Sequence, residues 1–147
     1  MSHIHQQIRD YVATQLGAIG MFSGRVYKMR SYALDAEKLP AVVVYTNTQQ
    51  SNPITIGTKT ARGQLELAVQ IHIKGASNTI SDDLDAACVL VENVMGGIFD
   101  LNGLAKSCVL STTEINVNVE GAQSMASAAL VYAVEYVTLS ADVETPA

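Results

Sequence analysis

Asp82, Asp83 and Asp85 form the densest group of side chains that could carry out chemistry. Clustered carboxylates are the ligands that Ca²⁺ and Mg²⁺ prefer in proteins. However, the EF-hand spacing is absent, because no glycine and no later bidentate glutamate stand at the required distances. The three carboxylates fall in the first turns of an expected helix, where the helix dipole stabilises negative charge. We therefore interpret them as residues of the helix start and expect no metal site.

The histidines and cysteines are the remaining candidates for catalysis or metal binding. His3 and His5 flank one residue near the N-terminus, and without a Cys or carboxylate partner set they do not make a zinc site. His72 and Cys88 are a conceivable nucleophile pair, because a strand can pack against the helix that follows it. Cys88 lies on the apolar stripe of that helix, however, and a buried thiol has a raised pKa and is inert. We expect no catalytic residues and no cofactor.

Composition limits the possible partners. The 147 residues correspond to a single domain, 1–147, and the longest apolar run, Ala128–Val134, is too short to span a membrane. Two cysteines, Cys88 and Cys108, are too few for a disulfide framework, so free thiols are expected. The net charge is −5, and the only local basic cluster is Arg25, Lys28 and Arg30. Such a chain is poorly suited to gripping nucleic-acid phosphates.

Hydrophobic periodicity predicts two helices and five strands. The apolar residues recur at helical spacing over 3–18 and 79–99. Strict alternation from Leu65 to Ile73 predicts a strand over 62–74 with one face in the core and the other in water. The other expected strands are 25–30, 39–46, 108–120 and 125–139, and in strand 108–120 Val109, Ile115, Val117 and Val119 are expected on one face.

These elements predict an α+β fold. The order is α-β-β-β-α-β-β, and the hairpin-like connections favour a mainly antiparallel five-stranded sheet with the two amphipathic helices packed on one face. Residues 47–61, which are polar, are expected to form a flexible loop, and residues 140–147 a frayed polar tail.

The low charge of the strand faces favours a role in subunit packing. Only 16% of the residues are charged, below the ~25% of typical soluble domains. The polar positions of the strands carry mainly Gln, Asn, Thr, Ser and Ala, and the cores of protein interfaces are similarly depleted of charge. A lightly charged monomer remains the alternative on composition alone.

Three segments resemble one protein family. They are Arg25–Thr46, which contains Leu39-Pro40-Ala41 and a run of valines; Arg62–Lys74 with the following Asp82–Asp85; and Ser111–Ile115 with the later strand that carries Tyr132 and Tyr136. With the order of elements, they resemble the tail terminator proteins of long-tailed bacteriophages, also called tail completion or minor tail protein U-like proteins. The resemblance covers roughly residues 3–138.

The resemblance implies a virion structural protein rather than an enzyme. Its subunits would assemble into a ring, a hexamer, at the head-proximal end of the tail tube. This ring ends tube polymerisation and offers a docking surface to the head. The implied partners are further copies of the chain, the tail tube protein and the head connector or stopper protein, while DNA passes through the lumen without specific binding. The family supplies no catalytic residues.

We also expect specific partner contacts. The hypothesis is that loop 47–61 projects toward the tube or lumen, with Ile54 and Ile56 as apolar anchors and Lys59 and Arg62 as polar ones. Deleting 51–59 should then leave the fold intact and abolish tube capping. The basic cluster of Arg25, Lys28 and Arg30 is a second candidate contact. Two alternatives stay open: a head–tail connector or stopper subunit, and an unrelated small enzyme or ligand-binding domain.

Overall fold

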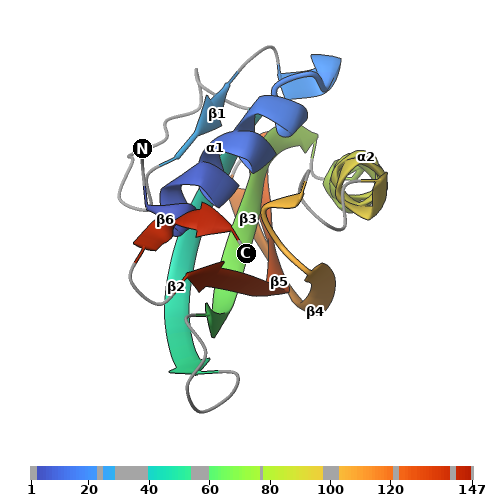
Figure 1. Cartoon of the computed structure of the whole chain (residues 1–147). Coiled ribbons are helices and arrows are strands. Elements are labelled where there is room, and N and C mark those ends of the chain that lie inside the picture. The colour runs from blue at the N-terminus through green and yellow to red at the C-terminus, as the bar shows by residue number, and fades with distance from the viewer. Residues whose placement is uncertain are drawn as a thin grey trace.

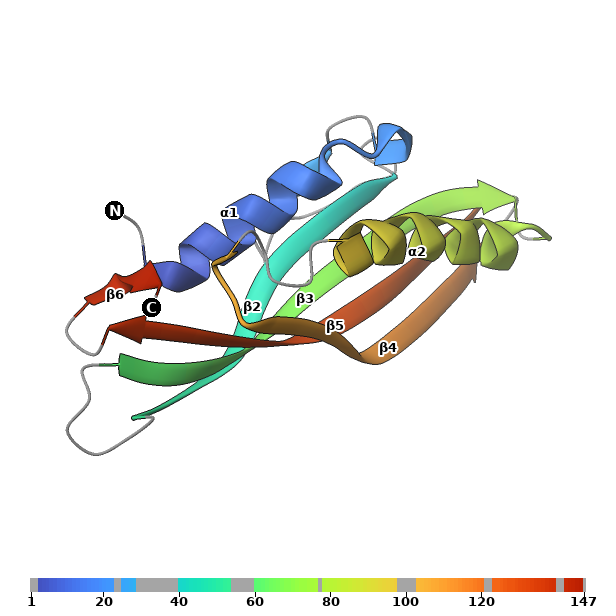
Figure 2. The ribbon, with the colours of Figure 1, turned by 45° about the vertical axis from the view of Figure 1, so that its right-hand side comes forward.

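Both helices lie on the same face of one sheet in the computed structural model (Figures 1 and 2). The structure describes residues 3–22, 25–28, 40–53, 60–76, 78–97, 103–120, 123–139 and 142–146. In chain order the elements are α1 (Ile4–Leu16), the short 3₁₀ helix η1 (Gly20–Phe22), β1 (Val26–Tyr27), β2 (Ala41–Pro53), β3 (Thr60–Ala76), α2 (Ile80–Gly97), β4 (Ser107–Glu120), β5 (Gln123–Leu139) and β6 (Asp142–Pro146).

The sheet confirms the predicted α+β class and element order. Its strands run β1-β2-β3-β5-β4, and β6 adds to β5. All pairings are antiparallel except β1 with β2. That parallel pair is short and places Val26 beside Val42, whose backbone N–H donates to the Arg25 carbonyl over 3.0 Å. Parallel neighbours need a crossover of about a dozen residues, and the chain between β1 and β2 has that length.

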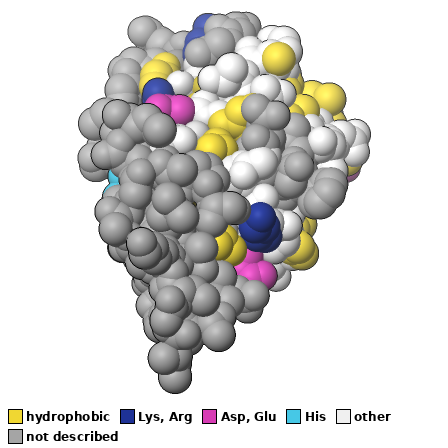
Figure 3. Space-filling view, in the orientation of Figure 1, with side chains coloured by type: hydrophobic (Ala, Val, Ile, Leu, Met, Phe, Trp, Pro, Cys, Tyr) yellow, Lys and Arg dark blue, Asp and Glu magenta, His cyan; other side chains and the backbone are white. Residues whose placement is uncertain are grey.

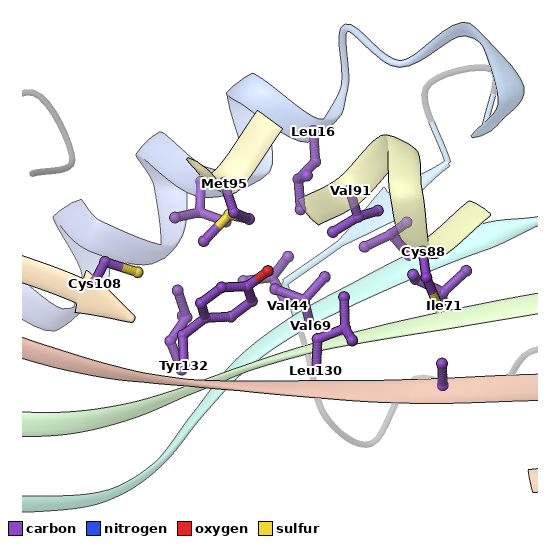
Figure 4. Close-up of a cluster of buried hydrophobic side chains, with 14 of the residues drawn as sticks. Leu16, Val44, Val69, Ile71, Cys88, Val91, Met95, Cys108, Leu130 and Tyr132 are labelled. Carbon is purple, nitrogen blue, oxygen red and sulfur yellow. The ribbon is translucent and has the colours of Figure 1, made fainter. Parts of the chain in front are cut away.

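The core lies between the helices and one face of the sheet. From α1, Ile4, Ile8, Val12 and Leu16 are fully buried, as their four-residue spacing predicts. Figure 4 shows side chains of α2, among them Val91 and Met95, above Val69 of β3 and Leu130 of β5. Alternation in β3 and β5 sends every second side chain into this core, because successive residues of a strand point to opposite faces.

Two expected irregular segments are largely strands. β2 continues through residues 47–53, where a loop was predicted, and Pro53 pairs with Ala61 of β3. Residues 140–147 were predicted to fray, yet Asp142–Pro146 form β6, which pairs with the end of β5. Both predictions failed because these segments lack apolar alternation, while backbone hydrogen bonding to a neighbouring strand does not require it. Residues 54–59 lie outside the described part of the chain.

A β-bulge in β4 changes which face its valines occupy. The register with β5 shifts between Leu110 and Thr112, so Ser111 has no partner of its own. Before the bulge, Val109 lies opposite Ala133, and after it Ile115 lies opposite Ala128. Ala133 is exposed on the open face, whereas Ala128 is buried under the helices. The prediction that Val109 shares a face with Ile115 and Val117 is therefore wrong.

Candidate interaction surface

β4 is the long edge strand of the sheet. It runs for 14 residues, and within the described chain β5 is the only strand that pairs with it. An edge strand exposes backbone N–H and C=O groups that are ready to pair with another strand. Figure 2 shows β4 along the border of the sheet, beside α2 but not covered by it. The strand therefore offers a row of backbone donors and acceptors at the surface.

Apolar side chains accompany this exposed backbone. Val109, Ile115 and Val117 retain 62%, 54% and 42% of their accessible surface, and Leu110 is also exposed. We call these four residues the β4 edge. Glu114 is the only charged residue between Ser107 and Val117. Soluble proteins usually protect an edge strand with lysines, prolines, bulges or short length. β4 is long and has no lysine or proline, so its bulge and its two glutamates, Glu114 and Glu120, are its only such protection.

The outer face of α2 carries a second group of exposed apolar residues. Val89 and Leu90 point away from the core stripe of the helix, and Val89 is 53% exposed. With Met125 at the start of β5, they complete the set of large exposed hydrophobic residues in the described chain. In the space-filling view, hydrophobic side chains appear along the right-hand side, where Figure 1 places α2 and β4 (Figure 3). The large exposed hydrophobic residues of the described chain thus lie on α2, on β4 and at the start of β5.

The face of the sheet opposite the helices is open and carries both polar and apolar side chains. On this open face the Gln70 amide donates to the Tyr45 hydroxyl over 2.9 Å, and the Gln70 carbonyl oxygen lies 3.2 Å from Nε2 of His72. Val43, Tyr45 and Ala68 form a small buried cluster beside these hydrogen bonds. The hydrogen bonds and this cluster hold β2 and β3 together on the side that carries no helix.

The sheet separates the two members of the conceivable nucleophile pair. His72 lies on the open face, opposite Ala41 and Ser127, whereas Cys88 belongs to the core under α2. Burial lowers the pKa of His72 and raises the pKa of the Cys88 thiol. Because His72 and Cys88 lie on opposite faces of the sheet, the imidazole cannot reach the thiol to take its proton.

Burial explains the shifted pKa values of Cys108 and Tyr132. Cys108 is buried in the core, which raises the pKa of its thiol to about 11. Burial also raises the pKa of Tyr132, whose hydroxyl has no hydrogen-bond partner among the described residues. Among the described residues, no group of three His, Cys, Asp or Glu side chains is placed to hold a metal ion. Asp82 and Asp83 lie in the first turn of α2, as predicted. Neither described helix is long and apolar enough to cross a membrane.

The structure describes only some of the residues that were predicted to contact partners. Lys28 is exposed at the end of β1, and its ammonium group forms an ion pair of 2.9 Å with Asp10 of α1. Arg25 is half-buried beside it, while Arg30 lies outside the described residues. The structure therefore describes only Arg25 and Lys28 of the predicted basic cluster, and the charge of Lys28 is paired with Asp10.

Of the contact residues predicted in loop 47–61 and just after it, the structure describes only Arg62. Arg62 lies within β3, where its backbone is paired with Asn52 and Val137. Ile54, Ile56 and Lys59 lie outside the described residues. The β4 edge was not among the predicted contacts. Periodicity placed its valines together on one face, and only the strand order reveals that β4 is an edge.

Comparison with known protein families gives a match over most of the chain. The family model of phage minor tail protein U matches residues 3–136. Among solved structures, a chain from the virion of a native gene transfer agent particle is similar, with 11% sequence identity, 90% coverage of both chains and a TM-score of 0.39. No curated protein matches the sequence.

Proposed function

The chain belongs to the phage minor tail protein U family, and from this premise we propose that it is the subunit of a ring that caps the tail tube. Membership makes it a structural protein of the bacteriophage virion, located in the tail. The ring, hexameric according to the family resemblance, ends tube polymerisation and presents a joining surface to the head. Its partners are further copies of the chain, the tail tube protein and the head connector.

The exposed, nearly uncharged β4 edge is the observation that carries this proposal. A closed ring needs a surface on each copy that binds a different surface on the next copy. Exposed apolar residues beside an unprotected edge strand mark a site of protein association. The net charge of −5 also suits a ring through which DNA moves, because a subunit with few basic residues does not hold phosphates strongly. No reactive group is required for such a role.

The tip of the β2–β3 hairpin is a proposed contact with the tube or lumen. β2 and β3 remain paired up to Pro53 and Ala61, so residues 54–59 connect the ends of two long paired strands (Figure 1). We retain Ile54 and Ile56 as apolar anchors and Lys59 as a polar one. The deletion of 51–59 would also remove paired residues of β2, so substitution at the tip is the cleaner test.

Tail length is the decisive measurement. Phage lacking this chain should produce tails of uncontrolled length, and supplying the chain in trans should restore normal, joined tails in electron micrographs. An I54N/I56N double variant should fold with unchanged thermal stability and fail to restore length control, while V89N, which alters an exposed valine of α2, should restore it. Normal tail lengths in the absence of the chain, with DNA leaking from heads, would instead assign it a stopper role.

A further inference from the structure

We propose that β4 of one copy pairs with the outer edge of β2 in the next copy, so that the sheet continues from subunit to subunit around the ring. This inference rests on the proposed ring and names the surfaces that close it. The occupant of the β4 edge is thus a second copy of this chain, contacting it through residues Thr46–Pro53. The exposed residues of the β4 edge then become buried at the junction.

The first observation is that the two opposite borders of the sheet both carry backbone without a described partner. At one border, β4 pairs only with β5 within the described residues. At the other border, β1 covers β2 only at Val42 and Val43, whereas β2 continues to Pro53. Backbone groups beyond the reach of β1 can therefore accept a further strand.

The second observation is strand direction. β2 is antiparallel to β3, β3 to β5, and β5 to β4, so β2 and β4 run in opposite directions within one copy. A neighbour placed beside β4 with its helices on the same face consequently presents its own β2 antiparallel to β4. Antiparallel pairing is the more stable ladder. Rotation about a ring axis places every copy in this relation to the next one.

The third observation is charge. Between Thr46 and Pro53 the sequence has no charged residue, and between Ser107 and Val117 of β4 only Glu114 is charged. Like charges directly opposite each other destabilise a strand pair, and this junction contains no such pair. A β4–β4 contact between two copies would instead form a closed dimer and could not extend into a ring.

Lysine substitution tests the β4 side of the junction. V117K places a charge on the edge strand, and V89K makes the same change at a comparably exposed valine on α2. Electron microscopy and native mass should show rings for wild type and V89K, in solution or on tube ends, and at least a tenfold loss of rings for V117K. Circular dichroism should show all three proteins folded. Rings formed equally by V117K, or lost equally by V89K, would overturn the inference.

Cysteine cross-linking identifies the occupant. T112C, E114C and N116C on β4 are each mixed with Q50C on β2, and N93C on the exposed side of α2 serves as the control. Oxidation of assembled rings should give a β4–β2 dimer between different copies for at least one mixture and none for N93C. A β4–β4 dimer alone, or no β4–β2 dimer in intact rings, would overturn the inference.

The two proposals fail in different ways. If wild type caps tubes while V117K caps them equally well, the ring function stands and the β4–β2 junction is wrong. If wild type forms the cross-linked rings but leaves tube length uncontrolled, the junction stands and the terminator function is wrong. A wild-type chain that neither associates nor caps would overturn both.

Discussion

The ring of Tyr136 lies over Gly63, its direct cross-strand partner, in the space that a Cβ atom at position 63 would occupy. Tyr136 can lie flat across β3 only because this partner has no side chain. From there its hydroxyl lies 2.6 Å from Nε2 of His5, which connects β5 to the first turn of α1. One glycine in a strand thus permits a tertiary contact between the two ends of the chain.

Substituting Gly63 should therefore destabilise the protein. We expect G63A to lower the free energy of unfolding by about 1–3 kcal/mol, because the methyl group must displace the Tyr136 ring. G96A is the matched control, since nothing lies within 4 Å of a Cβ there, and alanine in helix α2 should be neutral or stabilising. Thermal denaturation of both variants checks this. Equal melting temperatures for G63A and wild type would contradict the contact.

Two tyrosines on the same face of β5 should respond oppositely to loss of their hydroxyls. The Tyr132 hydroxyl is buried and has no partner in the described part of the chain, so Y132F should raise the free energy of unfolding by about 1 kcal/mol. The Tyr136 hydroxyl bonds to His5, so Y136F should lower it by about 1 kcal/mol. Urea denaturation measures both values. A destabilised Y132F would mean that its hydroxyl has a partner in solution.

His5 should make stability depend on pH. Burial, with the nearby charges of His3 and Arg9, lowers the pKa of His5 to about 4, so the unfolded chain binds a proton more readily than the folded one. The contribution of His5 to the free energy of unfolding is complete above about pH 6.5 and is lost as the pH falls toward 4. The urea midpoint should fall over this range. His72, whose pKa is also lowered by burial, adds a change of the same sign.

A glutamine at position 5 provides the control for this pH effect. H5Q cannot take up a proton but can still hydrogen-bond to Tyr136, so its urea midpoint should vary less between pH 6.5 and 4. H5Q/H72Q should vary least. If H5Q follows the wild-type curve throughout, His5 is not the group responsible.

The two cysteines should react slowly in the folded protein. Both thiols are buried and their pKa values are raised, so little thiolate is present at pH 8. A thiol-reactive dye should label native protein at least tenfold more slowly than protein unfolded in guanidinium chloride. N93C, with an exposed cysteine on α2, should acquire one rapidly labelled site. Rapid labelling of native wild type would place Cys88 or Cys108 at the surface.

The sequence alone determined the elements whose side chains enter the core. The spacing from Ile4 to Leu16 and the alternation from Leu65 to Ile73 report directly on burial, because each has the period of its own secondary structure. The order of the elements followed from these patterns, and the family resemblance followed from that order and three sequence segments. The exclusion of Cys88 from catalysis also followed from its position on an apolar helical stripe.

Only the tertiary structure decided which surfaces remain available for partners. Strand order makes β4 an edge, and a bulge of one residue moves Val109 to the face opposite Ile115. The polar second half of β2 is a strand because backbone pairing with β3 holds it there. Hydrophobic periodicity indicates which side chains share a face of one element, but it contains no information on which backbone lies next to which. The candidate contact surface depends on that pairing, and therefore emerged only from the folded chain.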